Sequence, residues 1–64
     1  MSFSFAREKA GMTQNEVAKA LGVNQSAVSF WESGRNQPRA KQMVKLAKLY
    51  GVTVDELLRE EDNG

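Results

Sequence analysis

Cysteine and histidine are both missing from the sequence, and each absence excludes a class of function. Without cysteine no disulfide can brace the chain, and a zinc site would have to consist of carboxylates alone. A glycine-rich phosphate-binding loop is missing too, and 64 residues leave little bulk to enclose a pocket. We therefore expect a single domain with no enzymatic activity, no metal site and no cofactor.

Long hydrophobic runs are also absent. No apolar segment approaches the roughly 18 residues that are needed to cross a membrane. The first residues lack the basic and then apolar pattern of a secretory signal peptide. We expect a soluble, cytoplasmic protein that does not contact a membrane.

The net charge of +1 conceals an uneven distribution along the chain. Residues 1–50 contain eight lysines and arginines against three glutamates, whereas residues 51–64 contain one arginine against five acidic residues. A basic body with an acidic end favours a surface that binds a polyanion. Ordinary surface helices carry similar charges, and for Lys45 and Lys48 we expect plain solvent exposure.

Apolar spacing and helix-capping residues predict an all-α chain of five helices. Glycines follow four of the apolar-periodic segments, and glycine is the residue that most readily ends a helix in the left-handed conformation. Thr13 with Glu16 forms a capping-box pattern, Asn24 precedes the third segment, and Thr53 precedes the last. The helices are predicted at about residues 3–10, 14–21, 25–33, 39–50 and 54–60.

Residues at helical spacing define the expected core. Trp31 follows Val28 on one face and offers the largest apolar surface, so we take it as the centre of the core. The residues expected to face inward are Phe3, Ala6, Ala10, Val17, Ala18, Leu21, Ala27, Val28, Trp31, Ala40, Met43, Leu46, Ala47, Tyr50, Val52, Leu57 and Leu58.

Two of the predicted helices meet across a very short turn. Leu21 ends the first, Gly22 and Val23 reverse the chain, and Asn24 caps the second, which is the pattern of a helix-turn-helix. Six short motifs lie in and around this pattern: Thr13-Gln14-x-Glu16-x-Ala18, Leu21-Gly22-Val23, Val28-Ser29-x-Trp31-Glu32-x-Gly34, Pro38, Leu46-Ala47 and Gly51-Val52-x-Val54-Asp55-x-Leu57-Leu58. With these motifs the chain resembles the Cro and lambda-repressor-like (XRE family) helix-turn-helix domains from Phe3 to Leu58. The resemblance implies a five-helix DNA-binding domain at residues 1–59, followed by a flexible acidic tail at residues 60–64.

The resemblance also implies roles for individual residues. The helix at about residues 25–33 would be the recognition helix in the major groove of double-stranded DNA. Its candidate base-contacting residues are Gln25, Ser26, Ser29 and Phe30. Candidate contacts to the DNA backbone are Gln14, Asn24, Ser33, Arg35, Asn36, Arg39 and Lys41. Gln14 would also brace Gln25, and Arg7 with Glu32 would form a partly buried structural ion pair.

Phe30 departs from the family pattern, because that position usually carries arginine, lysine or glutamine. Three interpretations stay open. The ring packs on thymine methyl groups in the major groove, it folds against the loop near Gly34, or it contacts a partner protein.

The function implied by the resemblance is sequence-specific DNA binding in transcription regulation, with a repressor favoured. One recognition helix covers only a few base pairs, so we expect a homodimer on a near-palindromic operator. The expected dimer surface is the C-terminal helix region from Val52 to Leu58, with Phe5 beside it. The alternative is a protein-interaction module, such as the antitoxin of a toxin–antitoxin pair or an anti-repressor.

Overall fold

The computed structural model describes residues 1–59, which fold into five α-helices without a strand. The helices are α1 (Phe3–Lys9), α2 (Gln14–Leu21), α3 (Gln25–Ser33), α4 (Ala40–Tyr50) and α5 (Val54–Leu58). No helix in this part of the chain is long and apolar enough to span a bilayer. The all-α prediction is confirmed, whereas the predicted flexible tail at residues 60–64 lies outside the described residues.

The start of each helix is encoded locally. In α2, Glu16 N donates to Thr13 Oγ1 at 3.1 Å while Thr13 N donates to Glu16 Oε1 at 2.8 Å, so the predicted capping box is present. Thr53 and Glu56 form the same reciprocal pair ahead of α5. The backbone N–H of Thr53 lowers the pKa of the Glu56 carboxyl, because hydrogen bonds to the charged form favour it. Asn24 occupies the N-cap position of α3, but its side chain makes no capping hydrogen bond.

Three helix ends differ from the predicted ones by one or two residues. Helix α1 ends at Lys9, and Ala10 is its C-cap. Helix α4 begins at Ala40, because Arg39 is extended (ψ 165°) and its N–H donates to Gln42 Oε1 at 3.1 Å. Helix α5 ends at Leu58, after which the backbone turns extended. Helix ends fray, and apolar spacing does not determine the last residue.

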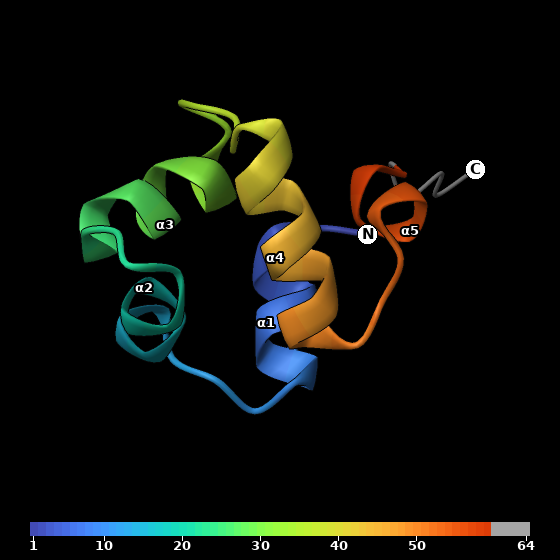
Figure 1. The fold of residues 1–64 in the computed structure, drawn as a ribbon, viewed down its shortest axis with the longest axis horizontal. Coiled ribbons are helices and arrows are strands. Elements are labelled where there is room, and N and C mark those ends of the chain that lie inside the picture. The colour runs from blue at the N-terminus through green and yellow to red at the C-terminus, as the bar shows by residue number, and fades with distance from the viewer. Residues whose placement is uncertain (60–64) are drawn as a thin grey trace.

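The helices pack around α4, which contacts α1, α2 and α5, while α3 packs on α1 and α2 (Figure 1). Helices α2 and α3 lie together on one side, and α5 lies on the other side beside the chain's N-terminus. The Met1 ammonium donates to the Arg59 carbonyl and so joins the start of α1 to the end of α5. The helix-turn-helix thus occupies one side of the domain, supported from behind by α1 and α4.

The core contains most of the residues predicted from helical spacing. Trp31 is buried in this core, and the most deeply buried large side chains are Leu46, Leu57, Val17 and Val28. The other buried apolar residues are Ala6, Ala18, Met43, Ala47 and Tyr50, and the partly buried residues packed against them include Phe3, Leu21, Ala27 and Val52.

Three of the predicted core residues are exposed instead, and one buried residue was not predicted. Ala10 lies beyond the last turn of α1, and Ala40 is the first residue of α4, so neither has a helix packed over it. Leu58 is 50% exposed, because Leu57 points into the core and the next residue along a helix cannot do so as well. The buried residue is Pro38, which was named from the sequence only as one of the family motifs.

Candidate nucleic-acid interface

The turn between α2 and α3 holds the two helices at a fixed angle. Gly22 ends α2 with φ +72°, in the left-handed region that glycine adopts without strain. Val23 N then donates to Ala18 O at 3.0 Å, and the Val23 side chain is partly buried against the core. Ala18 is almost fully buried, which lets the two helices approach closely. Helix α3 is therefore held at a fixed angle to α2.

A nearly buried ion pair ties the end of α3 to α1. Arg7 Nε donates to Glu32 Oε2 at 2.5 Å, and Arg7 Nη2 donates to Glu32 Oε1 at 3.2 Å. The two side chains are only 14% and 8% exposed. The hydrogen bond to Glu32 raises the pKa of Arg7 further, since the carboxylate favours the charged guanidinium. This fork fixes α3 to the body of the domain.

Arg7 also has a partner that the sequence did not reveal. Its Nη1 donates to the backbone carbonyl of Met12 at 2.8 Å, in the segment between α1 and α2. A backbone carbonyl leaves no trace in a side-chain pattern, so this contact could be found only from the fold. Arg7 thus joins α1, the connection to α2, and α3.

The two glutamines continue this network toward the exposed face of the helix-turn-helix. Gln14 Nε2 donates to Glu32 Oε1 at 2.9 Å, and Gln25 Nε2 donates to Gln14 Oε1 at 3.4 Å. A carboxylate only accepts, so Glu32 requires the amino group of Gln14 and leaves its carbonyl for Gln25. The structure thus brings together the four predicted residues Arg7, Glu32, Gln14 and Gln25. Gln25 keeps one N–H donor and its carbonyl oxygen directed away from this chain of bonds.

The other predicted base-contacting residues follow Gln25 along α3. Gln25 and Ser26 are exposed, and Ser29 and Phe30 are partly exposed. A shallow hollow of about 520 Å³ lies beside them, where the turn, α3 and the following loop meet. It is lined by Gly22, Val23, Asn24, Ser26, Ala27, Phe30 and Asn36. Four of the predicted DNA contacts, from three separate segments, therefore share one concave surface.

Phe30 folds against the loop that follows α3. The Arg35 guanidinium carbon lies 5.2 Å from the centroid of its ring, within the range of a cation–π contact. The Phe30 carbonyl accepts from Arg35 N at 2.9 Å, from Asn36 N at 3.3 Å and from Ser33 Oγ at 3.2 Å. Of the three interpretations left open for Phe30, contact with its own loop is observed in the structure.

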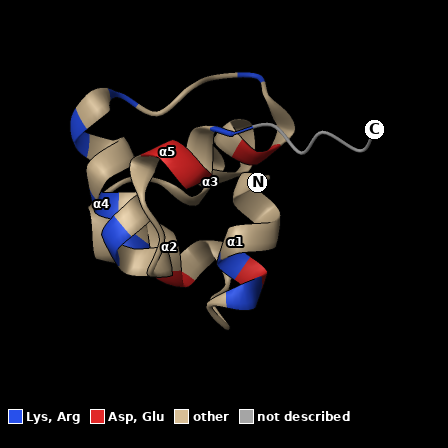
Figure 2. Cartoon of the chain, turned by 90° about the vertical axis from the view of Figure 1, so that its right-hand side faces the viewer, with Lys and Arg blue, Asp and Glu red and all other residues tan. Residues whose placement is uncertain are grey.

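The predicted contacts to the DNA backbone lie around α3. Asn24, Ser33, Arg35, Asn36, Arg39 and Lys41 are all exposed, and Gln14 is partly exposed. Figure 2 shows lysines and arginines on α4 and on the segment leading into it, and acidic residues on α5. Among the lysine and arginine side chains of residues 1–59, only Arg7 and Arg59 form an ion pair with an acidic residue. The cations beside α3 are therefore available to an external anion.

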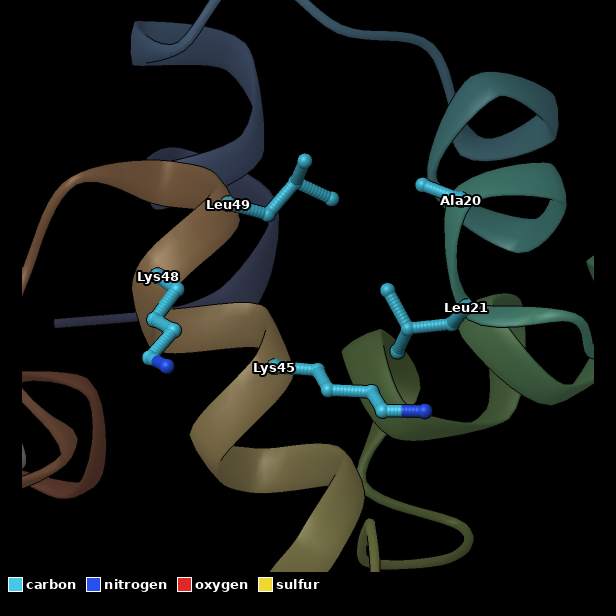
Figure 3. Close-up of a pocket in the computed structure, with 5 residues that line it drawn as sticks. All are labelled: Ala20, Leu21, Lys45, Lys48 and Leu49. Carbon is cyan, nitrogen blue, oxygen red and sulfur yellow. The ribbon is translucent and has the colours of Figure 1, made fainter.

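A second hollow of about 370 Å³ lies between α2 and α4, away from the predicted contacts (Figure 3). Ala20, Leu21 and Leu49 form its apolar wall. The stem of Lys45 extends from α4 toward Leu21, whereas Lys48 points away from α2. Both lysines are exposed as predicted, and long lysine stems commonly cover apolar surface in this way.

The fold and this constellation define a helix-turn-helix domain, and comparison with known proteins agrees. The helix-turn-helix family HTH_3 matches residues 5–57. The HTH-type transcriptional activator BcrR of Enterococcus faecalis is 39% identical over 51 residues, which are 80% of this chain and 25% of the activator. The cryptic phage CTXphi transcriptional repressor RstR of Vibrio cholerae is 34% identical over 56 residues, 88% of this chain and 50% of the repressor.

The match spans a larger share of another relative's own length. An uncharacterized HTH-type transcriptional regulator of Archaeoglobus fulgidus is 34% identical over 56 residues, 88% of this chain and 80% of its own. No solved structure matches the chain. The chain belongs to the XRE-type helix-turn-helix family, which consists of DNA-binding transcription regulators rather than enzymes. It spans only a quarter to a half of the activator and the repressor.

Proposed function

We propose that this chain is a sequence-specific DNA-binding repressor that reads an operator with α3 in the major groove. The bases are read by Gln25, Ser26 and Ser29, and Phe30, the fourth residue of the predicted set, lies beside them at the border of the hollow. Gln14, Asn24, Ser33, Arg35, Asn36, Arg39 and Lys41 contact the sugar–phosphate backbone. Double-stranded DNA is the partner, and the domain at residues 1–59 acts in the cytoplasm.

The polarity of the Gln25 amide carries this proposal. Its amino group gives one hydrogen to Gln14, and the remaining N–H and the carbonyl oxygen form one donor and one acceptor. Adenine presents the complementary pair in the major groove, with N7 as acceptor and N6 as donor. Because Glu32 orients Gln14 and Gln14 orients Gln25, the reading amide is set before DNA arrives.

Two-fold pairing supplies the specificity that one short helix lacks. Phe5 and Leu58 are 53% and 50% exposed, and the bond from Met1 to Arg59 joins the ends of the helices that carry them. We assign these two exposed apolar side chains to the contact surface between the subunits. A homodimer through the α5 region presents its two recognition helices about 34–36 Å apart, to successive turns of a near-palindromic operator.

The test is a random-oligonucleotide selection followed by binding measurements on two variants. Gln25→Ala is expected to cost about 1–3 kcal/mol on the selected operator and to lose preference at one base pair per half-site. Arg35→Ala is the contrasting variant. It is expected to weaken binding to all duplexes alike and to lower the slope of log K against log salt by about one.

Selection of an unchanged site by the Gln25→Ala variant would exclude the proposed docking of α3. No binding of the parent chain to any duplex at low salt would instead favour the alternative, a protein-interaction module such as an antitoxin or an anti-repressor. An exposed Phe30 was the feature that suggested such a partner. Its ring is only partly exposed and is in contact with Arg35, which weakens that argument.

A further inference from the structure

The loop between α3 and α4 is organised around one residue of the recognition helix. Gly34 ends α3 with φ +83°, and this left-handed turn sends the chain back over the last turn of the helix. Two backbone N–H groups of the returning loop and the hydroxyl of Ser33, the last residue of α3, then converge on the Phe30 carbonyl, which also accepts from the Gly34 N–H. Three of these donors belong to Ser33, Arg35 and Asn36, which are proposed phosphate contacts. The backbone of this loop is thus fixed relative to α3.

The Phe30 ring adds a constraint that the carbonyl cannot supply. An arginine side chain on an exposed loop has many rotamers and loses them when it binds. With its guanidinium carbon 5.2 Å from the Phe30 centroid, Arg35 is held over the ring before any ligand is present. Among the described residues its guanidinium has no hydrogen-bond or ion-pair partner, and a cation–π contact uses no N–H donor. The donors of Arg35 therefore remain available for a phosphate.

We propose that Phe30 is a positioning residue for Arg35, holding the guanidinium of the loop at a fixed place beside the recognition helix so that it meets a DNA phosphate. The inference rests on the proposed function and deepens it. A residue that stands where a base reader is expected acts instead through a neighbouring cation. The phosphate contact and the base-reading helix then move as one unit, because the same residue belongs to α3 and holds Arg35.

Two properties distinguish this role from base reading and from simple packing. A positioning residue strengthens binding to every duplex equally, since phosphates carry no sequence information. It also has no effect once Arg35 is removed, because it has nothing left to position. A base reader would alter preference at one base pair, and a packing residue would lower stability whether or not Arg35 is present.

The test compares Phe30→Leu with Phe30→Tyr, both in the full chain, and combines each with Arg35→Gln. Both variants keep the Phe30 backbone carbonyl and the hydrogen bonds that it accepts, so the comparison isolates the aromatic ring. Phe30→Leu is expected to weaken binding about two- to fivefold on the selected operator and on random duplex alike, the factor that an exposed cation–π contact supplies. Phe30→Tyr restores the affinity, and in the Arg35→Gln background Phe30→Leu changes nothing further.

A measurement on the free protein separates this inference from the proposed function. Proton resonances of the Arg35 side chain are expected to be shifted by the ring current in the parent chain and in Phe30→Tyr, and to return to ordinary values in Phe30→Leu. Unshifted resonances in the parent chain overturn the inference, whatever the DNA results. A loss of preference at a single base pair in Phe30→Leu also overturns it and makes Phe30 a base reader. An additive loss in the double variant overturns it as well. Shifted resonances in a chain that binds no duplex would end the proposed function, and with it the role of Phe30 and Arg35 in binding DNA.

Discussion

Removal of the Glu32 carboxylate is expected to destabilise the domain severely. Glu32 accepts three hydrogen bonds, two from Arg7 and one from Gln14, and its side chain is only 8% exposed. Beside Glu32 the Arg7 side chain is only 14% exposed, and Glu32→Ala leaves its guanidinium with the Met12 carbonyl as its close partner. Stranding one member of a buried pair costs about 3–5 kcal/mol, and the remaining solvent access of Arg7 points to the lower end of that range.

A loss of about 3 kcal/mol is nearly all that a domain of this size has. A single core in a chain below about 70 residues supplies roughly 3–5 kcal/mol. Each kcal/mol corresponds to about 4–8 °C in Tm at this length, so Glu32→Ala is expected to melt at least about 12 °C lower. Thermal unfolding followed by circular dichroism measures the shift. A variant that is already unfolded at 25 °C, and so shows no cooperative transition on heating, agrees with the same expectation.

Glu8→Ala is the matched control. Glu8 also faces Arg7, at 3.9 Å from Nη2, but its side chain is 69% exposed. An exposed pair of this kind contributes about 0–1 kcal/mol, so the control should melt within a few degrees of the parent chain. Glu32→Gln keeps an acceptor without the charge and should fall between the two. Equal melting temperatures for Glu32→Ala and Glu8→Ala would show that the network does not stabilise the fold.

Two further expectations concern the same region of the molecule. Burial raises the pKa of Tyr50 to about 12 from a usual value of 10.0, because it disfavours the phenolate. The contribution of neutral Tyr50 to the free energy of unfolding is thus complete below pH 10, and about 2 kcal/mol of it is lost as the pH rises from 10 toward 12. In urea unfolding, the Tyr50→Phe variant should lack this part of the alkaline loss of stability. Gln14→Ala should leave Tm within a few degrees of the parent chain, since the Arg7–Glu32 pair is kept, yet weaken operator binding severalfold by releasing Gln25. A Gln14→Ala variant that binds the operator with parental affinity would show that Gln25 needs no support.

The sequence predicts most of this fold because its signals are local. Capping at Thr13 and Thr53, and the left-handed turn at Gly22, each depend on a few consecutive residues, and all were predicted. Helical spacing identifies the core where another helix covers the face. It fails at Ala10 and Ala40, which lie at helix ends that nothing covers. A periodic pattern describes a face of a helix and not the neighbour that is required to bury it.

The candidate site was only partly predictable, for a different reason. The pair of Arg7 and Glu32 follows from resemblance, but the contact of Arg7 with Met12 depends on the path of the backbone. Likewise, three interpretations of Phe30 were equally compatible with the sequence. The fold favours one of them, since Gly34 directs the following loop back over the ring and brings Arg35 onto it. Contacts made by returning loops are set by tertiary geometry, which residue types alone do not encode.

Stability and recognition meet in the Glu32 carboxylate. Its Oε1 accepts from both Arg7 and Gln14, so the group that fastens α3 to α1 also sets the polarity of the two amides that are proposed to contact DNA. The same carboxylate therefore stabilises the fold and orients the amide of Gln25 through Gln14. Toward the other end of α3, Phe30 holds the following loop in two ways. Its backbone carbonyl accepts hydrogen bonds from the loop, and its ring contacts Arg35. Helix α3 is thus fixed at its start through Gln25 and is linked near its end to Arg35. On the proposed function, a helix of 9 residues is therefore enough to align the contacts to the bases with those to the phosphates.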